Sequence, residues 1–204
     1  MFTGIITDLG RVRAVSQSAM TRLEIETKYP TESIAIGASI ACNGVCLSVV
    51  EHGPGWFAVE ASAETLSKTT LGSWRQGAAV NLERPLKLGD ELGGHLVLGH
   101  VDGVGAVVER RQDGGSVRLT VKAPPDLARF VAPKGSIAID GVSLTLVAVE
   151  HAGFDVALIP HTLAATNLAD RRPGDRVNLE ADVLGKYVQK YLERIHGAAE
   201  ASGR

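Results

Sequence analysis

Much of the chain alternates apolar and polar residues with the period of two that is typical of β-strands. RLEIET at 22–27 and VRLTVK at 117–122 both follow this pattern. In SIACNGVCLSVV at 39–50, two apolar runs flank Asn43-Gly44, and Asn-Gly is a strong signal for a two-residue hairpin turn. The pattern predicts many short antiparallel strands joined by tight turns.

The same hairpin occurs twice. A shift of 97 residues superimposes ASIACNGVCLSVV (38–50) on GSIAIDGVSLTLV (135–147) and carries VNLE at 80–83 onto VNLE at 177–180. Because this shift is constant from residue 38 to residue 83, the two copies differ by no net insertion, which indicates an internal duplication. Many short strands with glycine-rich turns favour a small closed barrel or a sandwich in each half.

Helical patterns are short, except at the C-terminus. We expect helical pieces at SAETLSKTTL (62–71), PDLARFV (125–131) and PHTLAATNL (160–168). Residues 183–196 form a longer amphipathic helix, since apolar residues recur there at helical spacing: Leu184, Val188, Tyr191, Leu192 and Ile195. This apolar stripe either joins subunits or packs on the chain's own barrel.

Composition excludes several classes of function. With 45% hydrophobic and 22% charged residues the 204-residue chain is an ordinary globular sequence. Its net charge of −2 and 4% aromatic content argue against nucleic-acid binding. No apolar run is long enough to span a membrane, and MFTGIITDLGRVR does not have the order of a signal peptide, so we expect a soluble, cytoplasmic protein. We expect no metal, because the cysteine and histidine spacings are not those of ligand pairs.

The two hairpins present different reactive groups. In the predicted register, Cys46 and Ser48 share one face of their strand, as do Ser143 and Thr145 in the second copy, whereas Cys42 points to the opposite face from Cys46. Each half therefore places two small polar groups side by side. The alternatives are that Cys46 is a small buried hydrophobe and that the hydroxyls satisfy backbone groups.

A glycine-rich segment joins the two halves. LGDELGGHLVLGHVDG (88–103) contains His95 and His100 among glycines. Glycine lets the backbone approach a ligand closely, and histidine titrates near neutral pH, so the segment is a candidate part of a site. The alternative is a tight connection with two incidental histidines.

Four motifs together resemble riboflavin synthase: MFTGI at the N-terminus, NGVCL, GGHLVLGHVDG and IDGVSLTL. The resemblance implies a mainly β fold, with two similar six-stranded Greek-key β-barrels from the duplication and a C-terminal α-helix that assembles a homotrimer. The implied domains are lumazine-binding barrels at 1–90 and 91–182, followed by a trimerisation helix and tail at 183–204.

The implied activity is that of a transferase in riboflavin biosynthesis. Two molecules of 6,7-dimethyl-8-ribityllumazine exchange a four-carbon unit and give riboflavin and 5-amino-6-ribitylamino-2,4-pyrimidinedione, with no cofactor and no metal. Association with lumazine synthase is a further implied partnership. The alternative is a non-catalytic lumazine- or flavin-binding protein of the same fold. The retained Cys46, His95, His100, Ser143 and Thr145 favour the enzyme.

The resemblance also implies the site residues, in a site between the N-terminal barrel of one subunit and the C-terminal barrel of its neighbour. The first pocket would comprise Gly4, Ile5, Ile6, Cys46, Leu47, Ser48, Glu60, Ala61, Ser62 and Thr65. The second would comprise Gly99, His100, Val101, Lys134, Ser143, Leu144, Thr145, Ala157, Leu158, Ile159, Pro160, His161 and Thr162.

The catalytic candidates are Cys46, as nucleophile or as the group that positions one, and His100 with Ser143 and Thr145, for proton transfer. The chain departs from the family pattern at Ser48, where a threonine is usual, and at His161, where a glutamate is common. The hydroxyl is kept in the first case, and an acidic charge is replaced in the second.

Overall fold

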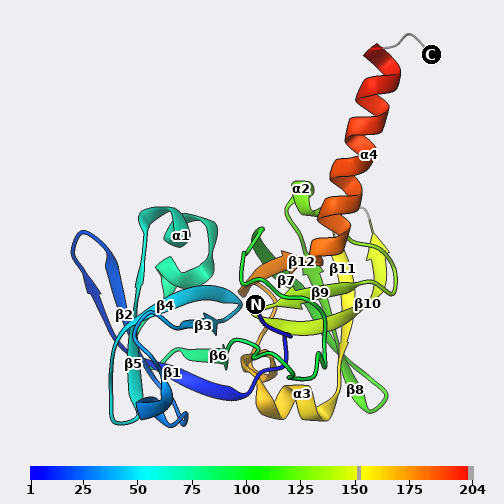
Figure 1. Cartoon of the computed structure of the whole chain (residues 1–204). Helices are drawn as coiled ribbons and strands as arrows, with labels where there is room; N and C mark the ends of the chain where they lie inside the picture. The colour runs from blue at the N-terminus through cyan, green and yellow to red at the C-terminus, as the bar shows by residue number, and fades with distance from the viewer. Residues whose placement is uncertain (151–152, 202–204) are drawn as a thin grey trace.

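The computed structural model describes residues 1–150 and 153–201, and its core is two closed six-stranded antiparallel β-barrels (Figure 1). The N-terminal barrel has the strand order β1-β2-β5-β4-β3-β6 and comprises β1 (Asp8–Gln17), β2 (Thr21–Glu26), β3 (Ser39–Cys42), β4 (Val45–Gly53), β5 (Trp56–Ala61) and β6 (Ala79–Glu83). The C-terminal barrel has the equivalent order β7-β8-β11-β10-β9-β12 and comprises β7 (Gly103–Asp113), β8 (Ser116–Lys122), β9 (Ser136–Ile139), β10 (Val142–Glu150), β11 (Gly153–Leu158) and β12 (Arg176–Ala181). The expected pair of duplicated barrels is confirmed.

The barrels form because alternate residues of each strand can be buried together. In β2 and β8, the strands predicted from alternation, Leu23 and Ile25 and then Leu119 and Val121 are fully buried, while their polar neighbours face outward. Each barrel encloses its own apolar core, centred on Phe57 in one and on Phe154 in the other. The repeat in the sequence is therefore a repeat of a complete folding unit.

The predicted hairpins are confirmed in their register and turn geometry. Cys42 pairs with Val45 and Ala41 with Cys46 across the turn. Asn43 and Gly44 both have positive φ angles, 45° and 76°, as the two-residue hairpin turn requires. Cys42 is fully buried in the core and Cys46 is half-buried on the outer face, so the two thiols point to opposite sides as expected.

Short helices close the barrels where the sequence predicted them. They are α1 (Ala63–Lys68) with the 3-10 helix η2 (Thr70–Ser73), α2 (Pro125–Ala128), and α3 (Pro160–Ala165) with the 3-10 helix η3 (Asn167–Ala169). A third 3-10 helix, η1 (Thr31–Ser33), precedes β3. Ser62 caps α1, because its hydroxyl accepts a 3.1 Å hydrogen bond from the amide of Thr65.

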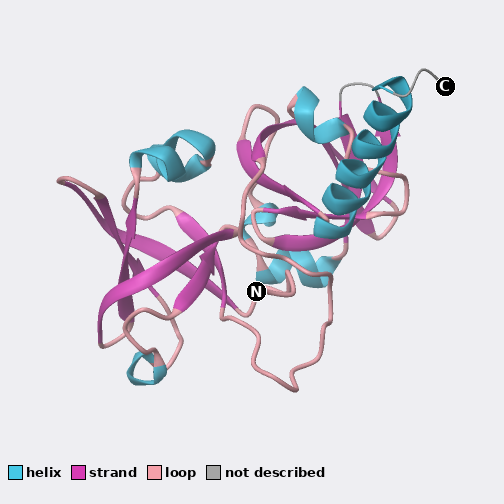
Figure 2. Ribbon diagram, turned by 45° about the horizontal axis from the view of Figure 1, so that its top comes forward, coloured by secondary structure: helices cyan, strands magenta, loops and turns pink. Residues whose placement is uncertain are grey.

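Helix α4 (Val183–Ala201) leaves the C-terminal barrel and projects beyond both barrels (Figures 1 and 2). Its apolar residues lie in solvent, with exposed fractions between 42% and 74% for Leu184, Tyr187, Val188, Tyr191, Leu192 and Ile195. The alternative that this stripe packs on its own barrel is wrong, because its apolar side chains stay exposed although Glu193 on the same helix contacts Arg129 at 3.3 Å. Within the described residues no helix has the length and apolar character that a membrane span requires.

The two barrels meet through their hairpin turns and a buried polar network. A Cβ placed on Gly44 would lie 2.7 Å from the amide nitrogen of Gly141, so the turns touch backbone to backbone. Around them, the side-chain amide of Asn178 donates to the carbonyl of Asn43, and that of Asn81 donates to the carbonyl of Asp140, both at 2.9 Å. These reciprocal bonds hold the barrels in one relative position.

Candidate active site

The segment that precedes each barrel lies against the other barrel. The amide of Ser143 in β10 donates to the carbonyl of Gly4 at 2.8 Å, and the amide of Cys46 in β4 donates to the carbonyl of Gly99 at 2.9 Å. Ile6 packs on the core of the C-terminal barrel, and Val101 packs on the core of the N-terminal barrel. We call residues 3–6 and 98–101 the crossing segments.

The crossing segments correct the expected grouping of the site. Gly4, Ile5 and Ile6 were expected beside Cys46, and Gly99, His100 and Val101 beside Ser143. The structure places the two segments the other way round. The repeat aligns each segment with the start of its own barrel, but the chain enters β1 and β7 from the opposite barrel, which a sequence shift cannot reveal.

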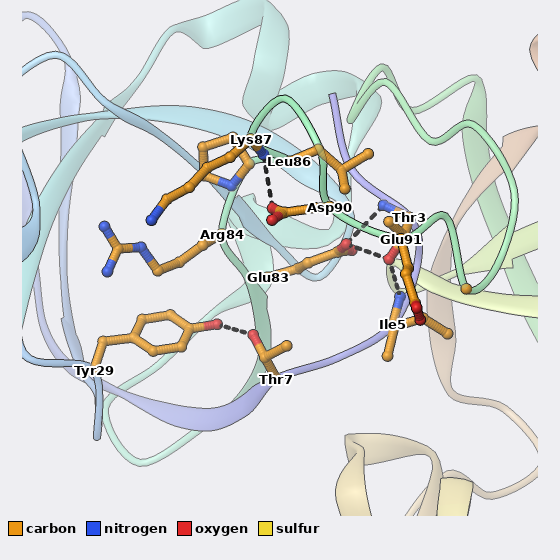
Figure 3. Close-up of a pocket in the computed structure, with 12 residues that line it drawn as sticks. Thr3, Ile5, Thr7, Tyr29, Glu83, Arg84, Leu86, Lys87, Asp90 and Glu91 are labelled. Atoms are coloured by element: carbon orange, nitrogen blue, oxygen red, sulfur yellow. Dashed lines mark hydrogen bonds between the residues drawn. The ribbon is translucent and has the colours of Figure 1, made fainter.

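Two buried glutamates hold the crossing segments. Glu83 accepts hydrogen bonds from the amide and the hydroxyl of Thr3 at 2.6 and 2.7 Å (Figure 3). It also accepts one from the amide of Gly4 at 2.9 Å. Its duplicate Glu180 accepts from the amides of Leu98 and Gly99 at 2.7 and 2.9 Å. Burial raises the pKa of both carboxyls, although these hydrogen bonds to the anion oppose the shift.

The sequence reasoning did not assign a role to these glutamates. The sequence does carry a signal for such a role. VNLE is identical at 80–83 and 177–180, and it places a carboxylate and an amide inside an otherwise apolar strand. In both copies all four residues are buried, so these strands are covered on both faces. On each strand the asparagine bonds to the other barrel, and the glutamate holds the crossing segment that precedes its own barrel.

Only glycine fits at the centre of each crossing segment. Gly4 and Gly99 have φ angles of 77° and 80°. A Cβ on Gly4 would lie 2.6 Å from the Cβ of Ser143, and one on Gly99 would lie 2.5 Å from the Cβ of Cys46. Cys46 and Ser143 thus occupy equivalent positions, each covered by a glycine backbone.

Beside Gly99, the N-terminal barrel presents Cys46 and Ser48 on its outer face. Cys46 is half-buried and Ser48 is exposed, whereas Leu47 between them is buried in the core. The remaining predicted residues of this pocket lie on the end of β5 and on α1, where Ala61 is buried, Glu60 is exposed, and Ser62 and Thr65 bond to each other at 3.0 Å.

Beside Gly4, the C-terminal barrel presents Ser143 and Thr145 in the same way. Ser143 is half-buried and Thr145 is exposed. The other predicted residues of this pocket fall into three groups: Leu144 and Leu158 in the core, Ala157 and Thr162 half-buried, and Lys134, Ile159, Pro160 and His161 exposed. His161, the second residue of α3, is exposed, so the position where the family commonly has glutamate is at the surface.

Besides the backbone bond to Gly4, Ser143 has a side-chain hydrogen-bond partner, which Cys46 does not have among the described residues. The Nδ1 atom of His95 lies 2.7 Å from the Ser143 hydroxyl, and His95 is only 7% exposed. Its Nε2 atom is buried without a hydrogen-bond partner in the described part of the chain. Burial lowers the pKa of His95, which keeps the ring neutral near pH 7. The sequence singled out His95 but did not place it beside Ser143.

His100 lies with Cys46, not with Ser143, within one chain. It follows Gly99 on the crossing segment that covers Cys46, and its side chain is exposed. Within one chain the expected group of His100, Ser143 and Thr145 is therefore divided: His100 lies over the N-terminal barrel, and Ser143 and Thr145 lie on the C-terminal barrel. The described residues contain no cluster of three or more side chains with metal-ligand chemistry.

A cavity of about 660 Å³ opens beside the first crossing segment (Figure 3). Thr3, Ile5 and Thr7 line one side, and Arg84, Lys87 and Asp90 line the other. It shares Ile5 with the predicted site but contains none of the predicted catalytic residues.

Comparisons with known proteins agree with this architecture. Residues 3–85 and 98–182 each match the model of the lumazine binding domain. The chain also resembles solved structures of LumP, with a TM-score of 0.81 for its complex with riboflavin, at 25% identity over 89% of this chain and 99% of that chain. The chain therefore belongs to the class of proteins built from two lumazine-binding domains.

Similarity in sequence gives the family within that class. The chain is 52% identical to the riboflavin synthase of Brucella abortus, over 95% of this chain and 98% of the relative. It is 44% identical to that of Mycobacterium tuberculosis, over 94% and 98%, and 35% identical to that of Bacillus subtilis, over 96% and 92%. The chain is a member of the riboflavin synthase family.

Proposed function

We propose that this chain is an enzyme that converts two molecules of 6,7-dimethyl-8-ribityllumazine into riboflavin and 5-amino-6-ribitylamino-2,4-pyrimidinedione. A four-carbon unit passes from one lumazine to the other, so the reaction needs two sites that are alike in shape but different in chemistry. The observation that carries the proposal is the equivalent placement of Cys46 and Ser143, each beneath a glycine of a crossing segment.

The two sites would meet between subunits. Within one chain, His100 lies on the crossing segment that covers Cys46, whereas Ser143 and Thr145 lie on β10 beneath the other crossing segment. A homotrimer would bring the N-terminal barrel of one subunit to the C-terminal barrel of the next. The exposed apolar stripe of α4 supports such an assembly, because a helix of this kind is stable when its apolar face is buried.

The residues have distinct proposed roles. Cys46, with the Ser48 hydroxyl beside it, adds to the acceptor ring or positions the nucleophile that does so. On the donor ring, the 7-methyl group loses a proton to a base formed by His100 of one subunit and the hydroxyls of Ser143 and Thr145 of the next. His95 orients the Ser143 hydroxyl from behind, across the 2.7 Å contact.

Positioning would supply much of the rate acceleration. Two rings held in register react as if within one molecule, which removes a large entropic cost. The rigid elements of the site support this role, because the crossing segments are fixed by Glu83 and Glu180 and by backbone bonds to β10 and β4. With this function, residues 1–90 and 91–182 are the two lumazine-binding units, and 183–204 are the trimerisation helix and tail.

The rival function is non-catalytic binding of a lumazine or flavin. LumP, whose fold is closely similar, has been solved in complex with riboflavin and with 6,7-dimethyl-8-(1'-D-ribityl) lumazine. The arrangement of Cys46, Ser143 and His95 favours the enzyme, because binding alone does not require a thiol and a histidine-backed hydroxyl at equivalent positions. We further propose a cytoplasmic location and association with lumazine synthase, the enzyme that makes the substrate.

Incubation of the purified protein with 6,7-dimethyl-8-ribityllumazine, without cofactor and with a chelator, tests the function. Chromatography should find one riboflavin and one pyrimidinedione for every two lumazines consumed. Tight binding of the lumazine with no riboflavin formed would assign the chain to the binding class. Light scattering on the same sample measures whether the active species is a trimer.

A further inference from the structure

A second cavity lies between the two barrels, away from all the residues predicted for the lumazine sites. Its volume is about 390 Å³. Both halves of the chain line it: Arg11 and Thr70 come from the N-terminal half, and Asn167, Asp170, Arg171 and Arg176 come from the C-terminal half. The cavity therefore depends on the way the barrels are joined.

The lining of this inter-barrel cavity is rich in arginine. Arg171 is neutralised by Asp140, whose carboxylate lies 2.6 Å from its guanidinium. Arg11 makes one 3.1 Å hydrogen bond to the carbonyl of Gly77, and Arg176 is exposed. Against these charges the lining has one carboxylate, that of Asp170. The cavity carries an excess of positive charge that is not compensated within its own walls.

Arg11 and Arg176 form no ion pair within the described residues. They do not occupy equivalent positions in the two repeats. Arg11 of β1 pairs with Ala79 of β6, whereas in the second barrel the equivalent pair is Ala106 of β7 and Arg176 of β12. Each barrel thus supplies one arginine. In the N-terminal barrel it comes from the first strand, β1, and in the C-terminal barrel it comes from the last strand, β12. Both arginines line the same cavity, so it receives one arginine from each barrel.

A buried hydroxyl in the same lining has no partner. Thr70 is 4% exposed, and its Oγ1 atom makes no hydrogen bond within the described residues. Its duplicate Asn167 is satisfied, since its side chain donates to Asn43 and Asp140 at 3.2 and 3.1 Å. Buried polar groups without partners are uncommon, but the Thr70 Oγ1 atom is covered from solvent and lies beneath the lining, so the charged donors that the cavity offers are its arginines.

From the charge of this lining we propose that the inter-barrel cavity binds a phosphate group, held by Arg11 and Arg176. Guanidinium groups bind phosphate with paired, charge-assisted hydrogen bonds. A phosphate presents oxygens in several directions, so it accepts from donors on two barrels at once, which a planar carboxylate does less well. The bound group would tie the two barrels together and stabilise the folded chain.

Thermal unfolding with inorganic phosphate tests the proposal on the full chain, with sodium chloride at matched ionic strength as the reference. At about 100 times its Kd, a ligand specific for the folded state raises the Tm of a chain of this size by roughly 5–10 °C. Ribose 5-phosphate in a parallel series distinguishes a phosphate ester from free phosphate. A rise with the ester alone would make a phosphorylated small molecule the ligand, and a rise with neither would overturn the proposal.

Variants locate the binding. Arg176→Gln and Arg11→Gln should each weaken phosphate binding by about tenfold or more, as expected for a lost charge-assisted bond. Asp170→Asn should strengthen it, a result that general destabilisation cannot produce. Arg111→Gln, an exposed arginine of β7 outside the cavity, is the matched control and should leave binding unchanged. Equal effects of Arg176→Gln and Arg111→Gln would refute the site, whatever the enzymatic activity of the chain.

Discussion

Substitution of Gly99 by alanine tests whether the crossing segment must touch Cys46. Alanine at a left-handed φ of 80° costs about 1–2 kcal/mol, which is roughly 2–8 °C in Tm for a chain of this size. Its Cβ would also lie 2.5 Å from the Cβ of Cys46. Since carbon atoms pack at about 3.5–4.0 Å, the two must separate by about 1 Å. A displacement of about 1 Å at a reacting group lowers the rate by about 10²-fold.

Gly37→Ala is the matched control for this substitution. Gly37 has a similar φ of 86°, but no atom of the described chain lies within 4 Å of its Cβ position. It should show the loss in Tm and normal turnover, whereas Gly99→Ala should show a larger loss in Tm and about 10²-fold slower riboflavin formation. Turnover is followed by riboflavin absorbance, and light scattering measures the oligomeric state of both variants. Equal turnover of the two variants would refute the view that contact between Gly99 and Cys46 shapes the site.

Three further outcomes are expected. Cys46→Ala should slow turnover by at least about tenfold with assembly intact, and near-normal turnover would remove Cys46 from the chemistry. Ending the chain after Leu184 should give a folded, monomeric and weakly active protein, as measured by light scattering and activity; a fully active trimer would contradict the role of α4. Burial lowers the pKa of His95, so below about pH 6.5 the unfolded chain binds a proton that the folded chain does not, and the free energy of unfolding falls as the pH falls. Urea unfolding should show that His95→Asn removes this part of the pH dependence, and parallel curves for the two proteins would contradict it.

The local features of the fold could be predicted because they depend on neighbouring residues. Asn43 and Gly44 both tolerate positive φ angles, so they favour a two-residue turn. That turn sets the register of the hairpin, and the register determines which face of the strand carries Cys46. The short helices α1 and α3 follow from spacing within a few residues. The duplication then extends each local prediction to the other half.

The site could be predicted only in part, because its assembly depends on distant contacts. Gly4 and Glu83 are separated by 79 residues, and Asn43 and Asn167 by 124. No periodicity records which barrel a segment of four residues lies against, so the exchange of the crossing segments could not be foreseen. The repeated glutamate of VNLE marked the need for a buried polar contact, but not the backbone that it binds.

The exchange of the crossing segments also sets the order in which the protein can mature during its synthesis. The surface around Cys46 is covered by Gly99, which is held in turn by Glu180 near the end of the second barrel. The first barrel can close as soon as residue 83 has left the ribosome, yet its reactive face stays open until almost the whole chain is available. Neither pocket is therefore functional while the chain is still being synthesised. Both become complete together, when the last strand of the second barrel is added.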